Sequence, residues 1–244
     1  DIDDRAAQLA GFALMMKARE DDRRIFQRIE DGEVSLNVYS LQSTEGLDVG
    51  ELWKALNLEE NQKQGSTGGL FDESIAVIPS KVGIYKDYFE LLQILKLAFI
   101  KAKTLGSLIQ IDNQHLQNLV ALKELLQAKE KGTDPSAKQA AINISPIINQ
   151  AITLAQKYDA VVANPPYMGS KWMGNELKSF AIKKFPNSKS DLFSIFMERS
   201  FSLLTESGYN AQVNMQSWMF LSSYEKLREW LLKSKSIMCL MQIG

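Results

Sequence analysis

The chain of 244 residues has very little cysteine or histidine, with one of each at Cys239 and His115. A disulfide within the chain is therefore impossible, and a zinc site of cysteine and histidine ligands cannot be assembled. A Ser-His-Asp or Cys-His mechanism would have to run entirely through His115, which disfavours both classes of hydrolase. We expect no metal, a buried and inert Cys239 within a strand, and a reducing, cytoplasmic setting.

Long hydrophobic runs and an excess of one charge are also missing. No stretch of about 18 apolar residues exists, so we expect no transmembrane helix and no membrane partner. Twenty-eight basic residues stand against 29 acidic ones, for a net charge of −1. This balance excludes a polycation that coats nucleic acid, but it does not exclude a local basic site. The glycines of residues 65–69 (GSTGG) lack a following Lys-Ser/Thr at Walker spacing, which favours a flexible loop over a phosphate site.

Apolar residues make up 45% of the chain, an ordinary globular balance, and the length suits one or two domains. Alternating apolar patterns predict strands at residues 34–41, 158–163, 209–215 and 237–243, with a short strand or turn at 106–112. Apolar residues at steps of three and four predict helices at residues 3–21, 52–58, 85–103, 114–129, 136–157, 176–185, 191–205 and 222–233.

The order of these elements predicts an α/β fold. From residue 158 onward, strand and helix alternate, which is the order of a parallel sheet. The middle of the chain is mostly helical and is interpreted as an insertion. We therefore divide the chain into an N-terminal part (1–44), a mainly helical insertion (45–157) and a catalytic α/β half (158–244).

Asn164-Pro165-Pro166-Tyr167 follows the compact apolar strand 158–163 directly. Ligands bind at the carboxyl ends of strands in open α/β sheets. Each proline fixes φ and removes an N–H donor, and the first also keeps Asn164 out of the helical region. The result is a stiff turn that offers two acceptors, the Asn164 side-chain oxygen and the Pro165 carbonyl, beside the ring of Tyr167. This arrangement matches a planar group that bears an NH₂, such as the edge of adenine.

A plainer interpretation is that two prolines simply end a strand, as Pro-Pro often does. That interpretation leaves the asparagine before the prolines and the tyrosine after them unexplained.

The motif resembles that of class I, S-adenosylmethionine-dependent amino-methyltransferases, chiefly adenine-N6 DNA methyltransferases. The resemblance extends to the opening DIDDRAAQLAGFALMMKARE, to YDAVVANPPYMGSKWM and to the segment SDLFSIFMERSFSLLTESGYNAQVNMQSWMFLSSYEKLREWL. Together these segments are similar to the PglX-type methyltransferases of BREX phage-exclusion systems. The resemblance implies a partial Rossmann-like sheet, S-adenosylmethionine as cofactor, and double-stranded DNA as partner, with other phage-exclusion proteins as possible partners.

The resemblance also implies roles for the motif residues. Asn164 and Pro165 would accept hydrogen bonds from the adenine N6 amino group and aim its lone pair at the methyl group. Tyr167 would stack on the adenine after it is flipped from the duplex. Pro166 would shape the turn.

Two aspartates are implied as cofactor-binding residues. Asp1 would fall where the family ends its second strand and binds the cofactor ribose, as dinucleotide folds do with an acidic residue. The alternative is that Asp1 belongs to an acidic helix N-terminus with Asp3 and Asp4. Asp112 would bind the cofactor adenine, a role for which the loop after Leu41 competes.

The segment after the motif is locally basic. In residues 167–190, five lysines stand against one glutamate, a local charge of +4. Lys171, Trp172 and Lys178 are therefore candidates for DNA contact, with a solvated helix face as the alternative.

The family's glycine-rich cofactor loop and target-recognition domain have no counterpart in this sequence. We therefore expect a chain truncated on both sides that is inactive alone and binds S-adenosylmethionine poorly. Two rival interpretations stay open: a protein glutamine N5-methyltransferase of the same fold, and a non-catalytic structural or DNA-docking fragment.

Overall fold

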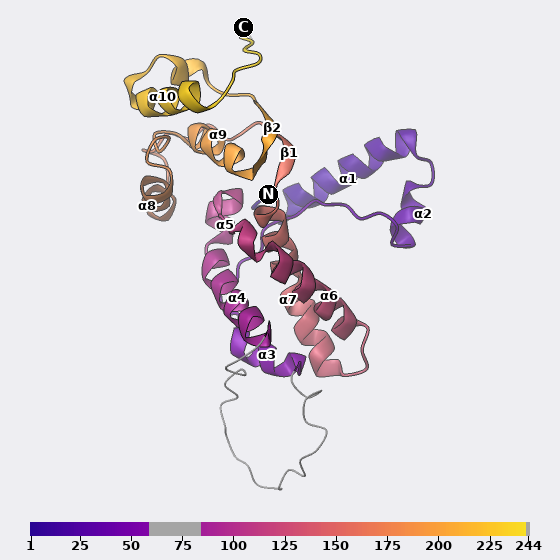
Figure 1. Cartoon of the computed structure of the whole chain (residues 1–244). Coiled ribbons are helices and arrows are strands. Elements are labelled where there is room, and N and C mark those ends of the chain that lie inside the picture. The colour runs from indigo at the N-terminus through magenta and orange to yellow at the C-terminus, as the bar shows by residue number, and fades with distance from the viewer. Residues whose placement is uncertain (59–83, 243–244) are drawn as a thin grey trace. The chain divides into compact units, whose positions relative to one another are not determined.

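The computed structural model describes residues 1–58 and 84–242, and it divides the chain into two compact units, Asp1–Ala155 and Gln156–Gly244 (Figure 1). The glycine-rich residues 65–69 and the end of the last predicted strand, Ile243, lie outside the described residues. The division into 1–44, 45–157 and 158–244 stays a prediction. Within the described ranges, no helix is long and apolar enough to cross a membrane.

The described part of the first unit is built from helices. The predicted helix at 3–21 is confirmed as α1, and Asp3 caps it by accepting from the backbone N–H groups of Arg5 and Ala6. The predicted helix at 85–103 is divided into α4 and α5. The elements are α1 (Asp4–Asp21), α2 (Ile25–Glu30), α3 (Val49–Leu56), α4 (Ile84–Phe99), α5 (Ala102–Leu105), η2 (Gly106–Leu108), η3 (Asn113–His115), α6 (Leu116–Glu130) and α7 (Pro135–Ala155).

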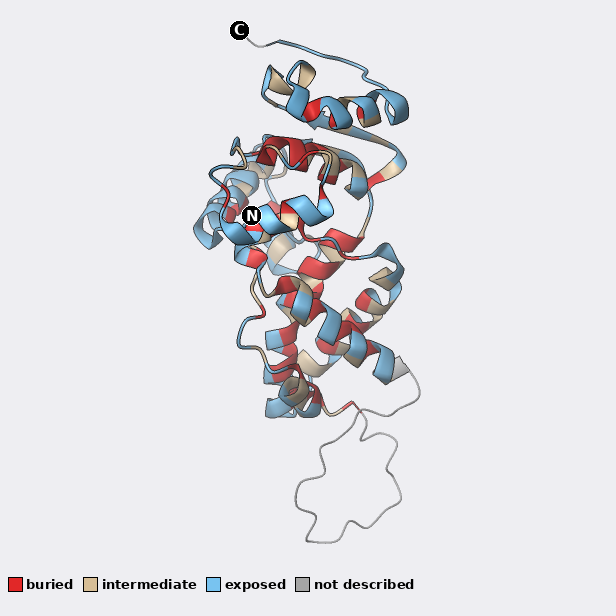
Figure 2. Ribbon diagram, turned by 90° about the vertical axis from the view of Figure 1, so that its left-hand side faces the viewer, coloured by how far each residue is buried: buried red, intermediate tan, exposed pale blue. Residues whose placement is uncertain are grey.

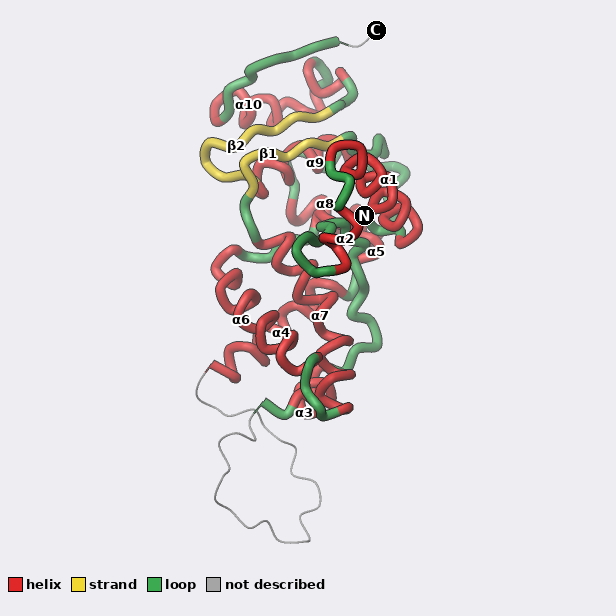
Figure 3. Tube along the Cα trace, turned by 90° about the vertical axis from the view of Figure 1, so that its right-hand side faces the viewer, coloured by secondary structure: helices red, strands yellow, loops and turns green. Residues whose placement is uncertain are grey.

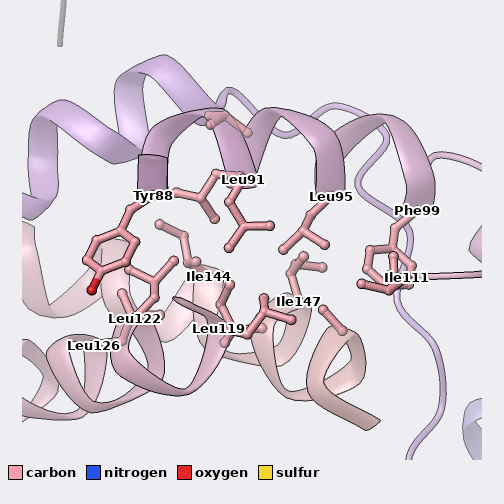
Figure 4. Packing of buried hydrophobic residues seen from close by; sticks show 14 of the residues in the cluster. Tyr88, Leu91, Leu95, Phe99, Ile111, Leu119, Leu122, Leu126, Ile144 and Ile147 are labelled. Atoms are coloured by element: carbon pink, nitrogen blue, oxygen red, sulfur yellow. The ribbon is translucent and has the colours of Figure 1, made fainter. Parts of the chain in front are cut away.

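The core of the first unit forms where α3, α4, α6 and α7 bring their apolar faces together (Figure 4). Apolar residues recur every three or four positions on these helices, so each helix has one face to bury. Figure 2 shows these faces as buried stripes flanked by exposed turns. The labelled core residues are Tyr88, Leu91, Leu95, Phe99, Ile111, Leu119, Leu122, Leu126, Ile144 and Ile147.

The predicted strand at Val34–Leu41 is wrong, because this segment is extended but forms no ladder. Its backbone makes isolated hydrogen bonds instead: the N-terminal group of Asp1 donates to the Tyr39 carbonyl, the Leu41 N–H donates to the Asp1 carbonyl, and the Val34 N–H donates to the Arg28 carbonyl. Isolated bonds of this kind cannot support a strand, since a strand requires a run of partners on a neighbouring strand.

The second unit combines a two-stranded parallel sheet with helices (Figure 3). Strand β1 pairs with β2 from Ala160↔Tyr209 to Ala163↔Gln212, which confirms the predicted parallel arrangement of these two strands. Pairing shifts between Tyr158 and Ala160, so β2 begins five residues before the predicted start. The elements are β1 (Tyr158–Ala163), α8 (Asn175–Lys184), α9 (Leu192–Leu203), β2 (Leu204–Gln212), η4 (Gln216–Met219), η5 (Ser222–Tyr224) and α10 (Glu225–Ser234).

The sheet is less buried than its apolar sequence predicts. Helix α9 packs against both strands, yet Val162 in β1 is 81% exposed and Tyr209 in β2 is 67% exposed. The predicted strand at 158–163 is therefore confirmed, but its predicted burial is wrong, because no described element covers the side chain of Val162. The chain is thus helix-rich with a small parallel sheet, consistent with a partial α/β fold.

The last predicted strand is also wrong over its described part, residues 237–242, which take no regular structure and are exposed. Cys239 is consequently exposed rather than buried. An alternating apolar segment becomes a strand only where another strand supplies hydrogen-bond partners, and none of the described strands does so here.

Candidate active site

The Asn-Pro-Pro-Tyr turn begins where the sheet ends. Asn164 follows the last residue of β1, and the Ala163 carbonyl accepts the final ladder hydrogen bond from the Val213 N–H at 3.1 Å. Because β1 and β2 are parallel, their carboxyl ends lie at one edge of the sheet. Asn164 and Val213 therefore flank each other at the edge where ligands of α/β proteins bind.

The turn anchors one residue and presents the others. Pro165 is buried, whereas Asn164 and Pro166 are exposed and Tyr167 is 50% exposed. The Tyr167 hydroxyl donates to the Val213 carbonyl at 3.1 Å and lies 3.5 Å from Asn164 Oδ1. The shorter bond goes to Val213, so the asparagine oxygen remains available to another donor.

The ring of Tyr167 is also supported from the side. Phe193 meets it edge-to-face, with ring centroids 6.1 Å apart, an arrangement that aromatic pairs favour. The hydroxyl contact at Val213 and the ring contact at Phe193 together fix the direction in which the exposed part of Tyr167 faces.

Asp191 is a site residue that the sequence interpretation missed. It is buried, and its Oδ1 accepts from the backbone N–H groups of Met168 at 3.0 Å and Phe193 at 3.2 Å. The Leu192 N–H donates in return to the Met168 carbonyl at 3.0 Å. Asp191 thus caps α9 and clamps the residue after the motif. An aspartate directly before an apolar helix is a signal that could have indicated the cap, but nothing in it indicates the clamp.

Tyr224 lies behind Phe193, with ring centroids 5.6 Å apart, and both belong to the apolar cluster of the second unit. Burial raises the pKa of the Tyr224 hydroxyl, and the negative charge of Asp191 raises it further. The phenol therefore stays neutral at physiological pH. The rings of Tyr167, Phe193 and Tyr224 are in contact one after the other, so the motif turn is supported by packed aromatic side chains.

The three candidates for DNA contact in the basic segment after the motif are all exposed to solvent. Lys171 and Lys178 are exposed, and Trp172 is 84% exposed. The loop that carries Trp172 is joined to the start of α9, since the Ser170 N–H donates to the Ser190 carbonyl at 2.9 Å. The motif, Lys171, Trp172 and Lys178 thus all belong to the second unit.

Asp1 and Asp112, the predicted cofactor residues, lie in the first unit. Asp1 Oδ1 accepts from the N–H groups of Ile2 at 2.7 Å and Asp3 at 2.9 Å, and Asp112 Oδ1 accepts from the Gln114 N–H at 3.0 Å. Both side chains are exposed, and the second carboxylate oxygen of each takes no hydrogen bond from the described residues. Among residues 1–58 and 84–242, no cluster of histidine, cysteine and acidic side chains could hold a metal.

Comparison with known proteins decides the family. The model of the Eco57I restriction-modification methylase family matches residues 1–244. The chain belongs to the Eco57I methylase family. As a member of that family it is 51% identical, over all of its length, to the adenine-specific methyltransferase BrxX of Escherichia coli O9:H4 (strain HS). It is 33% identical, over 94% of its length, to the adenine-specific methyltransferase PglX of Lacticaseibacillus casei (strain Zhang).

A third relative shares a shorter region. The type II restriction enzyme and methyltransferase RM.Eco57I of Escherichia coli is 30% identical over 93 residues, 36% of this chain. The chain spans 20% of the length of BrxX and 17% of the length of PglX. The resemblance seen in the sequence is thus confirmed at the level of the family.

Proposed function

We propose that this chain carries the catalytic turn of an adenine-N6 DNA methyltransferase that uses S-adenosylmethionine and acts in phage defence. The observation that supports the proposal is the Asn-Pro-Pro-Tyr turn at the carboxyl end of β1, with Asn164 and Tyr167 exposed, in a chain similar to proteins named adenine-specific methyltransferases. The finer fold belongs to the same proposal: a Rossmann-like sheet, of which β1 and β2 are part, interrupted by an insertion at residues 45–157.

The turn would bind and orient the adenine amino group. The exposed Asn164 Oδ1 and the Pro165 carbonyl accept its two hydrogens, which draws the nitrogen lone pair out of the ring system. Proline contributes no N–H at positions 165 and 166, so the turn offers acceptors to a donor group. Tyr167 stacks on the flipped base. The rate would come from this positioning and from electrostatics rather than from a covalent intermediate.

The carboxylates of Asp1 and Asp112 fit the hydrogen-bond donors of S-adenosylmethionine. Each is exposed and spends Oδ1 on the turn that follows it, which leaves one oxygen to accept from a ribose hydroxyl or an adenine amino group. Asp1 would hold the ribose and Asp112 the adenine. The cofactor supplies the electrophilic methyl group when it is bound.

The proposed macromolecular substrate is double-stranded DNA, contacted by Lys171, Trp172 and Lys178. Phage-exclusion proteins are the proposed partners, because the relatives carry the names BrxX and PglX. The reaction would take place in the cytoplasm, where bacterial DNA lies.

The test uses the full-length protein, methyl-labelled S-adenosylmethionine and unmodified genomic DNA, with modified positions read by sequencing. We expect N6-methyladenine with the wild-type protein and none with Asn164→Ala, whose circular dichroism should match that of the wild type. Methylation by the variant, or label that appears on protein glutamine instead of DNA, would contradict the proposal.

A further inference from the structure

Trp172 presents a large apolar side chain to solvent from a firmly held turn. It is 84% exposed, more than any other large apolar side chain among the described residues. The backbone N–H of Trp172 donates to the Gly169 carbonyl at 2.9 Å, and the next residue, Met173, is only 5% exposed. The backbone is therefore anchored on the inner side while the indole extends outward.

This turn is joined to the catalytic motif and to α9. Gly169 forms an isolated bridge with Asp191, and the Ser170 N–H donates to the Ser190 carbonyl. Trp172 lies five positions after Tyr167 in the sequence, and Asp191 holds Met168, which lies between them. Such bracing lowers the entropy that Trp172 would lose when it enters a binding partner.

The surroundings of Trp172 are those of a nucleic-acid contact. Residues 167–190 carry a charge of +4, and Lys171, Lys178 and Lys189 are all exposed. Lysines of this kind neutralise phosphates and hold a duplex without reading its sequence. An exposed aromatic ring among phosphate-binding lysines is suited to stack on bases.

We propose that Trp172 enters the DNA base stack and fills the space that the flipped adenine leaves. This inference rests on the proposed function. A flipped base leaves its neighbours unstacked on one side, at a cost of a few kcal/mol. Apolar side chains that insert between base steps offset such a cost in other DNA-binding proteins. Tyr167 would stack on the flipped base outside the DNA duplex, and Trp172 would occupy the space that the base leaves within the duplex.

The test compares two duplexes that contain the methylation site found by sequencing. In one, the target adenine is paired with thymine; in the other, it faces an abasic position, so that less pairing has to be broken. The full-length variants are Trp172→Ala, Trp172→Phe, Lys178→Ala and, as a control of similar exposure, Leu232→Ala, which is 68% exposed on α10. The measurements are kcat/KM for methylation and the fluorescence of 2-aminopurine at the target position.

Loss of base–aromatic stacking predicts that Trp172→Ala lowers kcat/KM on the paired duplex by about 5- to 150-fold. On the abasic duplex its activity should return to within about threefold of the wild type. Trp172→Phe should retain most of the activity, and Leu232→Ala should match the wild type. Lys178→Ala should lower kcat/KM by the same factor on both duplexes. The 2-aminopurine signal of Trp172→Ala should fall on the paired duplex alone.

Equal losses of Trp172→Ala on both duplexes, or no loss on either, would overturn the inference. Equal losses would indicate instead that Trp172 packs against another part of the protein. Failure of the proposed function looks different, because then the wild-type protein would methylate neither duplex. In that case, a wild-type 2-aminopurine signal that depends on Trp172 would still support the insertion, and its absence would overturn it.

Discussion

The backbone N–H of Met168 donates a hydrogen bond of 3.0 Å to the carboxylate of Asp191, which lies 23 residues further along the chain. The same carboxylate oxygen caps α9 by accepting from the Phe193 N–H. One buried side chain thus sets both the start of a helix and the path of the loop that follows the Asn-Pro-Pro-Tyr turn. The position of the turn is therefore coupled to the packing of α9.

Asp191→Ala should lower activity by more than its effect on stability accounts for. Loss of a helix cap costs about 1–2 kcal/mol, and here the Met168 N–H would also lose its acceptor. We expect kcat/KM to fall at least about tenfold, because small displacements of positioning groups are costly to catalysis.

Asp134→Ala is the matched control for Asp191→Ala, because Asp134 accepts from the Ser136 and Ala137 N–H groups in the first turn of α7 and belongs to the first unit, whereas the motif belongs to the second. Thermal unfolding and steady-state methylation of the two variants separate the effects. Equal activity in both variants would contradict a role for Asp191 in positioning the turn.

Tyr167 should tolerate the loss of its hydroxyl better than the loss of its ring. Tyr167→Phe keeps the stacking surface and the contact with Phe193, and it removes the 3.1 Å bond to the Val213 carbonyl and the 3.5 Å contact with Asn164 Oδ1. We expect a loss of up to about tenfold in kcat/KM for Tyr167→Phe and a loss of about 5- to 150-fold for Tyr167→Ala. Steady-state kinetics on the same DNA measure both, and a larger loss with phenylalanine than with alanine would argue against stacking.

Gln150 should stabilise the region around Gln42. Its amide is buried, at 1% exposure, and it pairs with the Gln42 backbone N–H at 2.7 Å and carbonyl at 3.0 Å. Gln150→Ala would leave two backbone groups without partners, at a cost of about 1–3 kcal/mol. Hydrogen exchange of the Gln42 amide should become about 5- to 150-fold faster. Gln139→Ala, on the exposed face of the same helix, should leave that rate unchanged.

Asp4 should make the attachment of α1 sensitive to acid. Its carboxylate accepts from Lys103 Nζ at 2.8 Å, and also from Ser40 and from Gln42 Nε2. The hydrogen bond from Lys103, followed by those from Ser40 and Gln42, holds the pKa of Asp4 below its ordinary 3.8. Because the folded pKa is depressed, the contribution is complete above pH 3.8 and is lost as the pH falls further.

The measurement is the protection factor of the α1 amides from pH 5 to pH 2. Protection should fall below pH 4 in the wild type, with a smaller fall in Asp4→Asn, which cannot titrate at this position. Parallel curves for the two proteins would show that another group controls the transition.

The Asn-Pro-Pro-Tyr turn was predictable because its causes are local. Residues 158–163 favour a strand, Pro165 and Pro166 end it, and the parallel pairing of β1 and β2 follows from the strand–helix–strand order. Asp3 likewise lies directly before the first turn of α1, a position where an acidic residue indicates a helix N-terminus. These features depend on neighbours within a few residues, which a sequence displays directly.

Other features depended on partners that a local pattern does not reveal. Residues 34–41 alternate like a strand but have no described neighbouring strand to pair with, and Cys239 lies in an apolar segment that no described strand joins. Asp191 was predicted as the first residue of a helix, but its bond to Met168 depends on the path of the loop between them. Burial of Val162 was predicted because its side chain is apolar. Whether a residue is buried depends on the elements that cover it, which its own side chain does not reveal.

The open face of the sheet has a practical consequence for purification. Val162 and Tyr209 place apolar side chains in water on two adjacent strands that offer hydrogen-bonding groups for further β-pairing. Exposed surface of this kind favours aggregation as concentration rises. Sedimentation of residues 1–244 expressed alone should therefore reveal oligomers, and charged substitutions at Val162 and Tyr209 should improve the solubility of the preparation.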